Sequence, residues 1–206
     1  MLRVGLTGGI ACGKSTVGEM LARRGAHLLQ ADVLAHQLYA PGAAVYGEVV
    51  HHFGREILNE DGTINRATLA RVAFPNRIGE LNAIVHPAVI KAQNEWMAEV
   101  ARENPHGIAV VEAALIIEAG VARDFDKIIV VTCDFERRVE RYAERASISL
   151  AAALSEVDRR GAAQLPDEEK VRHADYVIEN SGAVEDTERQ VEQIWNKLQT
   201  LASGCS

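Results

Sequence analysis

The sequence predicts an α/β domain built on a five-stranded parallel sheet. Short apolar runs rich in valine and isoleucine alternate along the chain with longer stretches of helical periodicity. The runs are apolar at nearly every position, as in strands that helices cover on both faces. At 206 residues, the chain is long enough for one such domain with a substantial core.

The beginning of the chain predicts a strand, a glycine-rich loop and a helix. The strand is expected at 4–7 and the helix at 15–24, where Gly25 ends it. A second strand is expected at 26–32, with Asp32 at its carboxyl end. Ligands of open α/β sheets bind at the carboxyl ends of the strands, so Asp32 is expected on the ligand side.

The second half of the chain completes the predicted sheet. Two continuous β-branched runs, at 107–113 and 126–134, are its clearest strands. A helix at 135–145 follows, and a last strand at 174–182 precedes a closing helix at 185–201.

We assign the core to 1–32 and 106–206, and two further parts are expected, an insertion between the core segments and a lid within the second of them. Between about 33 and 105 no strand-like run occurs, and helical stretches are separated by Gly- and Pro-containing breaks, which predicts a helical insertion. Within it, His86 precedes a proline and is expected at a helix end. A polar, Ala-rich segment at about 146–166 has a composition typical of a mobile lid.

Composition and charge exclude several classes of protein. The net charge of −7 argues against nucleic acid or an anionic membrane as the main partner. No apolar run is long enough for a membrane span, and no signal peptide is recognisable. Cys12, Cys133 and Cys205 are too scattered for a disulfide framework or a zinc site, which favours a reducing cytoplasm. The oligomeric state cannot be predicted.

The loop after the first strand matches the phosphate-binding motif GxxxxGK[ST]. Gly8, Gly13, Lys14 and Ser15 occupy its fixed positions between a predicted strand and a predicted helix. Glycines let backbone N–H groups converge on an anion, and the helix amino terminus adds partial positive charge. We expect Lys14 to reach the terminal phosphates of ATP and the Ser15 hydroxyl to coordinate Mg²⁺. The alternative is a glycine-rich turn that only caps a helix.

Asp32 and an arginine-rich helix suggest a kinase. A carboxylate at a strand end can accept the proton of a substrate hydroxyl, although Asp32 could instead cap the following helix. Arg138, Arg141 and Arg145 share one face of the predicted helix, where guanidinium groups could neutralise a transferring phosphoryl group. Because glutamates are interleaved with them, an ordinary salt-bridged surface helix is the alternative.

Several stretches resemble the dephospho-coenzyme A kinases over nearly the whole chain, from residue 3 to about 195. They are "GLTGGIACGKST", "QADVLAHQLYAPG", "FGREILNEDGTINRATLARVAF", "LNAIVHPAV", "VVEAALIIEAG", "RRGAAQLPDEEK" and "ADYVIENSG". The resemblance implies a P-loop kinase that phosphorylates the ribose 3′-hydroxyl of dephospho-coenzyme A with ATP and Mg²⁺.

The resemblance also implies residue roles. Asp32 is the implied base, Lys14 and Arg141 are implied to act in catalysis, and the insertion is implied to cover the coenzyme A end. Nucleotide contacts are implied for Gly8, Gly9, Ala11, Cys12, Gly13, Lys14, Ser15, Thr16, Arg145 and Asn180. Substrate contacts are implied for Asp32, His86, Glu118, Arg160 and Gln164.

Two departures from the family pattern and two rival functions stay open. Gln30 and Glu112 stand where the family commonly has aspartates, so Glu112 is expected to support Mg²⁺ only through water.

A kinase of another small hydroxylated metabolite would share the loop, base and lid. A nucleotide-binding module without catalysis would need the loop alone, whereas the absent NKxD motif argues against a small GTPase.

Overall fold

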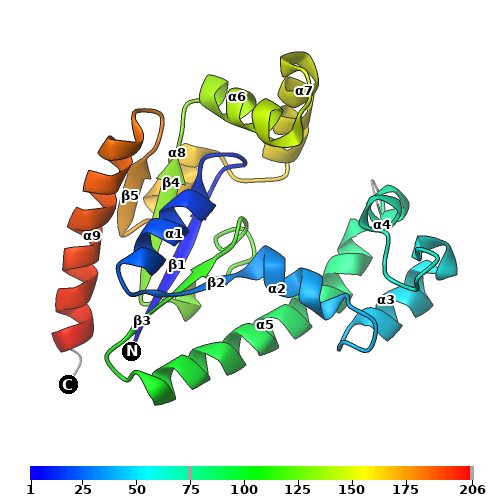
Figure 1. Cartoon of the computed structure of the whole chain (residues 1–206), viewed down its shortest axis with the longest axis horizontal. Coiled ribbons are helices and arrows are strands. Elements are labelled where there is room, and N and C mark those ends of the chain that lie inside the picture. The colour runs from blue at the N-terminus through cyan, green and yellow to red at the C-terminus, as the bar shows by residue number, and fades with distance from the viewer. Residues whose placement is uncertain (74–75, 205–206) are drawn as a thin grey trace. The chain divides into compact units, whose positions relative to one another are not determined.

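The computed structural model describes residues 1–73 and 76–204, which form two compact units (Figure 1). One unit comprises Met1–Gln30 and Val100–Ser206, and the other comprises Ala31–Glu99. Cys205 lies outside the described residues. No helix in the described part of the chain is long and apolar enough to cross a membrane.

The first unit contains a five-stranded parallel sheet in the order β2-β3-β1-β4-β5, which confirms the predicted fold class. Leu6 on the central strand lies opposite Glu112 on one side and Ile129 on the other. Because all strands run in one direction, their carboxyl ends share one edge of the sheet. The strands are β1 (Leu2–Gly8), β2 (His27–Gln30), β3 (Ile108–Glu112), β4 (Lys127–Thr132) and β5 (Tyr176–Glu179).

Helices cover the sheet on both faces. The helices of this unit are α1 (Lys14–Arg23), α6 (Phe135–Ala146), α7 (Leu150–Gly161), α8 (Asp167–Arg172), α9 (Val184–Gly204) and the short 3₁₀ helix η2 (Ala122–Asp124). Val4 and Leu6 of β1 are fully buried in a cluster that includes side chains of α1 and α9. Gly5 faces the opposite side, where a Cβ would lie 2.8 Å from Cδ1 of Ile128. The alternation along β1 therefore fills two apolar layers.

The predicted lid segment contains a helix, α7, that was not predicted from the sequence. Ser149 caps the amino terminus of α7 by accepting a hydrogen bond of 3.2 Å from the N–H of Ala152. Ala153 and Val157 are buried one turn apart and pack with Tyr142 of α6. The N-cap serine and the high helix propensity of alanine explain this helix.

Two boundaries near the start of the chain differ from the predictions. β2 ends at Gln30 and α2 begins at Ala31, so the prediction that Asp32 ends the strand is wrong. Asp32 instead lies in the first turn of α2, where a carboxylate interacts favourably with the positive end of the helix.

The second unit is helical and has its own apolar core. Its elements are α2 (Ala31–Leu38), α3 (Tyr46–Phe53), the 3₁₀ helix η1 (Arg55–Ile57), α4 (Arg66–Ala73) and the greater part of α5 (Ile78–Glu103). Its core consists of Val45, Val49, Phe53, Ile57, Ile64, Leu69, Ala73, Leu81 and Val85. A cluster of this size gives the unit an interior independent of the sheet.

His86 lies inside α5, so the expectation that it stands at a helix end is wrong. Pro87 follows it within the same helix, although a proline removes one backbone hydrogen bond there. Val85 before the proline and Val89 after it both contribute to the apolar cluster of the unit. The helix continues because this packing on both sides of Pro87 offsets the lost hydrogen bond.

Candidate active site

The phosphate-binding loop joins β1 to α1, and neighbouring backbone and side chains press closely against it. A Cβ at Gly8 would overlap the carbonyl oxygen of Val131 on β4. Gly13 has a φ of 94°, and a Cβ there would overlap the side-chain nitrogen of Asn180. The two fixed glycines of the motif therefore meet a steric requirement as well as a conformational one.

Asn180 follows β5 and holds the loop from the side of the sheet. Its Nδ2 donates a hydrogen bond of 2.7 Å to the carbonyl oxygen of Cys12. Its Oδ1 accepts one of 2.7 Å from Oγ1 of Thr187 on α9, and the side chain is buried. Because both ends of the amide are bonded, Asn180 fixes the position of the loop relative to α9.

Lys14 folds its side chain back over the loop that precedes it. Its Nζ donates hydrogen bonds to the carbonyl oxygens of Gly8 at 3.2 Å and Gly9 at 2.9 Å. The loop therefore carries a positive charge at its centre, beside the amino terminus of α1. Both features favour an anion such as a phosphate group.

Ser15, Glu112 and Gln30 form a hydrogen-bonded chain between α1, β3 and β2. Ser15 Oγ donates to Glu112 Oε1 at 2.7 Å, and Gln30 Nε2 donates to Glu112 Oε2 at 3.0 Å. Gln30 and Glu112 are register partners on neighbouring parallel strands, which explains why their side chains meet. Glu112 is 8% exposed, and its carboxylate is bonded at both oxygens.

This chain of residues fits a magnesium ion bound together with a nucleotide. Because Ser15 donates its hydrogen to Glu112, the lone pairs of its oxygen are available to a cation. Oxygen ligands are the ones that Mg²⁺ prefers, and it commonly retains several waters. No group of three His, Cys, Asp or Glu side chains within residues 1–73 and 76–204 could hold a metal alone. Phosphate oxygens of a bound nucleotide and water molecules are the further ligands that suit such a cation.

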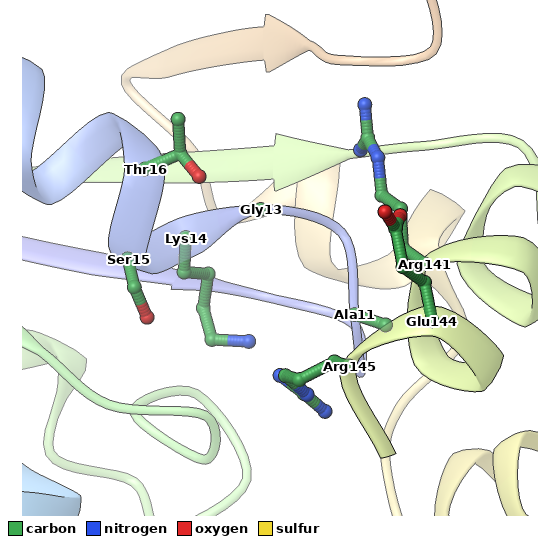
Figure 2. A pocket seen from close by; sticks show the side chains of 8 residues that line it. All are labelled: Ala11, Gly13, Lys14, Ser15, Thr16, Arg141, Glu144 and Arg145. Carbon is green, nitrogen blue, oxygen red and sulfur yellow. The ribbon is translucent and has the colours of Figure 1, made fainter. Parts of the chain in front are cut away.

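A pocket of about 480 Å³ lies between the loop and α6 (Figure 2). Lys14 and Ser15 line one side, and Arg141 and Arg145 line the other. Arg141 Nη1 lies 3.5 Å from the carbonyl oxygen of Cys12 and 3.4 Å from Sγ of Cys133. The full lining is Ala11, Gly13, Lys14, Ser15, Thr16, Arg141, Glu144 and Arg145. Three cationic side chains around one cavity are suited to a polyphosphate.

Arg138, on the same helix, is held by Asp167 of α8. The two side chains form an ion pair that is largely buried, and Arg138 Nε also donates to the carbonyl oxygen of Cys133 at 2.7 Å. A Cβ at Gly9 would overlap the Arg138 guanidinium, so this group packs directly on the phosphate-binding loop. Arg138 is thus a structural support of the loop, while Arg141 and Arg145 face the pocket.

The two described cysteines at the site are buried thiols. Burial raises the pKa of Cys12, although Lys14 and Arg138 oppose the effect. Burial also raises the pKa of Cys133, against the opposing charge of Arg141. Both are therefore protonated at neutral pH and are poor nucleophiles.

Glu118, Arg160 and Gln164 are absent from the lining of this pocket, as far as the described residues define it. Arg160 is exposed, and its Nε lies 3.3 Å from Glu156 Oε2. Gln164 follows α7 and donates its backbone N–H to the carbonyl oxygen of Gly161 at 2.9 Å. Glu118 accepts the N–H of Leu165 at 3.0 Å and forms an ion pair with Lys170.

Asp32 and His86 belong to the second unit, and both are exposed. Asp32 lies one helical turn before His36 on α2, and Arg66 Nη1 lies 2.9 Å from His36 Nδ1 and 2.8 Å from Nε2. Burial and the charge of Arg66 lower the pKa of His36, and Asp32 opposes this shift.

Three supporting residues were not assigned roles from the sequence. Gln30 and Asp167 are bonded to groups distant in the chain, and local patterns carry no signal for such pairs. Lys170 lies in a charged stretch and gives no sign in the sequence of being buried. Only for Gln30 did the sequence hold an indication of a role, because this residue stands next to the predicted carboxyl end of a strand.

Known proteins resemble this chain over most of its length. A family model described as "Dephospho-CoA kinase" matches residues 2–186. The dephospho-CoA kinase of Aquifex aeolicus is 41% identical over 202 residues, which cover 96% of this chain and 98% of that protein. The corresponding protein of Geobacter metallireducens is 42% identical, with 96% of both chains covered. A solved structure of dephospho-CoA kinase from Campylobacter jejuni matches with a TM-score of 0.69 and 26% identity, covering 96% of this chain and 97% of that one.

Proposed function

The chain belongs to the dephospho-CoA kinase family, and we propose that it transfers the terminal phosphoryl group of ATP to the ribose 3′-hydroxyl of dephospho-CoA. The products are CoA and ADP, and the reaction is the last step of CoA biosynthesis. The observation that carries the proposal is the pocket in which Lys14 and Ser15 face Arg141 and Arg145. We assign the reaction to the cytoplasm.

The nucleotide is bound by the phosphate-binding loop and α6. Backbone N–H groups at the start of α1 and the ammonium of Lys14 attract the β- and γ-phosphates. Arg141 and Arg145 add positive charge opposite Lys14, where negative charge spreads over the transferring group. The residues assigned to this role are Gly8, Gly9, Ala11, Cys12, Gly13, Lys14, Ser15, Thr16, Arg145 and Asn180.

Magnesium is the cation that we assign to Ser15. When bound, it neutralises charge on the phosphate oxygens during transfer. Glu112 accepts the Ser15 hydrogen and so directs the lone pairs of Oγ away from itself, and Gln30 fixes the other oxygen of Glu112. Glu112 would thus support the cation through Ser15 or through water, without binding it directly.

Asp32 is the residue that we assign to the acceptor hydroxyl. Its carboxylate accepts the hydroxyl proton as the new O–P bond forms, while the bond between the γ-phosphorus and the ADP oxygen breaks. We further assign the contacts with the acceptor to the second unit, and His86 is one of the residues assigned to them. The described residues of this unit do not line the nucleotide pocket, and the unit has its own apolar core.

The proposal is tested by measuring ADP release from ATP and Mg²⁺ with a panel of acceptors. We expect release to depend on dephospho-CoA and to be at least about a hundredfold slower with adenosine, AMP or shikimate. Preference for another acceptor would favour a different metabolite kinase. Tight ATP binding without turnover on any acceptor would favour a nucleotide-binding module.

A further inference from the structure

Lys170 of α8 is a charged side chain that is completely buried. Its exposure is 0%, and its Nζ lies 3.0 Å from Oε1 of Glu118, in the segment between β3 and β4. The geometry is that of an ion pair rather than a hydrogen bond. An ammonium group loses its hydration when it is buried, so a lysine is found in such a place only when a partner is fixed there.

Glu118 joins Lys170 to the end of the lid segment. The same oxygen, Oε1, accepts a hydrogen bond of 3.0 Å from the backbone N–H of Leu165, which follows α7. The Glu118 side chain is 15% exposed, and its Oε2 finds no hydrogen-bond partner within the described part of the chain. The contacts of this carboxylate are therefore directed at Lys170 and Leu165.

Helix α8 makes a second charged contact at its amino terminus. Asp167, three residues before Lys170, pairs with Arg138 of α6, and the Arg138 guanidinium packs on Gly9 of the phosphate-binding loop. The short helix therefore connects the segment after β3 to the loop through two ion pairs with buried or half-buried partners. Neither contact involves a residue that lines the nucleotide pocket.

Contacts at the start, in the middle and after the end of the α6–α7 pair hold these two helices in place. At the start of α6, the N–H of Asp134 donates to Ser181 Oγ at 2.8 Å. In the middle, side chains of α6 and α7 pack with Ile10 of the loop. At the end of α7, the N–H of Leu165 is held by Glu118. Arg141 and Arg145 project from this helix pair into the nucleotide pocket, so their position depends on how the pair is held.

We propose that Glu118, charge-balanced by Lys170, is a positioning residue that fastens the end of the α6–α7 pair through the Leu165 amide. Lys170 forms the ion pair that balances the charge of the Glu118 carboxylate, and Glu118 holds the backbone of Leu165. This contact keeps Arg141 and Arg145 beside the phosphate-binding loop. The inference rests on the proposed role of that pocket in ATP binding, and it assigns Glu118 to positioning in place of the substrate contact that the family resemblance implies.

Two double variants separate the backbone contact from the charge pair. Lys170→Met/Glu118→Gln removes both charges but keeps an oxygen that accepts the Leu165 N–H. Lys170→Met/Glu118→Leu removes both charges and the acceptor. Each is compared with wild type in melting temperature, in amide exchange over residues 162–165, and in Mg²⁺–ATP affinity by calorimetry. Arg137→Met is the control, because Arg137 forms an exposed ion pair with Glu140 on α6.

We expect the Leu variant to bind Mg²⁺–ATP at least about fivefold more weakly and to exchange the Leu165 amide at least about fivefold faster. The Gln variant and Arg137→Met are expected to stay within about twofold of wild type in both measurements. Equal ATP affinity in the Leu variant and wild type, despite faster exchange at Leu165, would overturn the proposal. So would equal losses of affinity in the two double variants.

The wild-type protein provides a second test if the double variants do not fold. The proposal requires the Leu165 amide to exchange as slowly as amides inside α7, and exchange at the rate of an exposed loop would contradict it. Neither readout uses an acceptor. Failure of dephospho-CoA phosphorylation by the wild-type enzyme would therefore count against the proposed function, while the affinity and exchange results would still decide the positioning role.

Discussion

Ser15 donates its hydroxyl hydrogen to Glu112, with Oγ and Oε1 2.7 Å apart. The first residue belongs to the helix after the phosphate-binding loop, and the second ends the neighbouring strand β3. The contact fixes the direction of the hydroxyl hydrogen, and so leaves the oxygen lone pairs to a cation. Magnesium binding is consequently expected to depend on both partners.

Replacing either partner is expected to weaken the dependence of the reaction on Mg²⁺. Ser15→Ala removes the proposed ligand, and Glu112→Gln removes the charge that orients it; each is expected to raise the Mg²⁺ concentration for half-maximal rate by about tenfold or more. A magnesium titration at saturating ATP measures this. Ser203→Ala, on α9, is the matched control, and a Ser15→Ala curve that superimposes on that of the control would refute the assignment.

Lys14→Ala is expected to abolish turnover while leaving the fold intact. The side chain contributes two hydrogen bonds to the carbonyl oxygens of Gly8 and Gly9, but no part of the apolar core. Its charge is aimed at the phosphates, so kcat/KM is expected to fall more than about tenfold with a nearly unchanged melting temperature. Lys197→Ala on α9 is the control. Retention of more than about a tenth of wild-type turnover would contradict this role.

Gly13→Ala is expected to impair nucleotide binding through Asn180. The new Cβ would overlap the Asn180 amide that holds Cys12, and the φ of 94° is unfavourable for alanine. ATP affinity is expected to fall at least about tenfold, with a lower melting temperature. Gly47→Ala is the matched control, because among the described residues no atom beyond its chain neighbours and the nearby backbone of its own helix lies within 4 Å of a Cβ there, and alanine suits helix α3. Unchanged ATP binding by Gly13→Ala would show that Asn180 does not brace the loop.

The sequence predicted the part of the site that one continuous segment builds. β1, the loop and α1 follow each other directly, so the motif correctly predicted a strand, a loop and a helix, with Gly8 at the end of β1 and Lys14 and Ser15 at the start of α1. The arginine face of α6 could likewise be predicted from local sequence, because helical periodicity brings Arg141 and Arg145 to one side of the helix.

The contacts that fix these segments could not be predicted in the same way. Lys170 meets Glu118, and Arg138 meets Asp167, only because the parallel sheet brings distant segments together. Pro87 continues a helix because tertiary packing outweighs its local preference. The helix over the lid segment could have been predicted, since Ser149 and the alanines after it are favourable for helix formation.

Cys12 and Cys133 are expected to resist alkylation in the folded protein. Burial raises the pKa of both thiols, so less thiolate is present near pH 8 than in the unfolded chain, and the reaction should accelerate as the pH rises. Iodoacetamide labelling followed by mass spectrometry measures both sites separately. Labelling of Cys12 in native protein at the rate seen in denaturant would contradict this expectation.

Asp32→Asn is expected to lower kcat by at least about a hundredfold while both substrates bind within a few-fold of wild type. The reason is the lost acceptor for the hydroxyl proton. If the carboxylate acts as the base, the acidic limb of the wild-type kcat profile should be absent in the variant. Asp61→Asn, in an exposed turn of the same unit, is the control. A loss of less than about tenfold would reassign Asp32 to the helix terminus, and Glu112 would be the next carboxylate to test.

His86→Ala is expected to raise the acceptor KM and leave the ATP KM nearly unchanged. His86 is exposed on α5, in the unit to which we assign the acceptor. Steady-state rates with each substrate varied in turn separate the two constants. An unaltered acceptor KM would leave His86 without a role in binding.

The most direct test of the central claim is the position of the transferred phosphoryl group, followed by phosphorus-31 NMR with ATP, Mg²⁺ and dephospho-CoA. We predict a new phosphomonoester resonance coupled to the ribose 3′ proton, which grows in step with ADP and is absent with Lys14→Ala. ADP that accumulates without this resonance, or a phosphate at any other hydroxyl, would contradict the account.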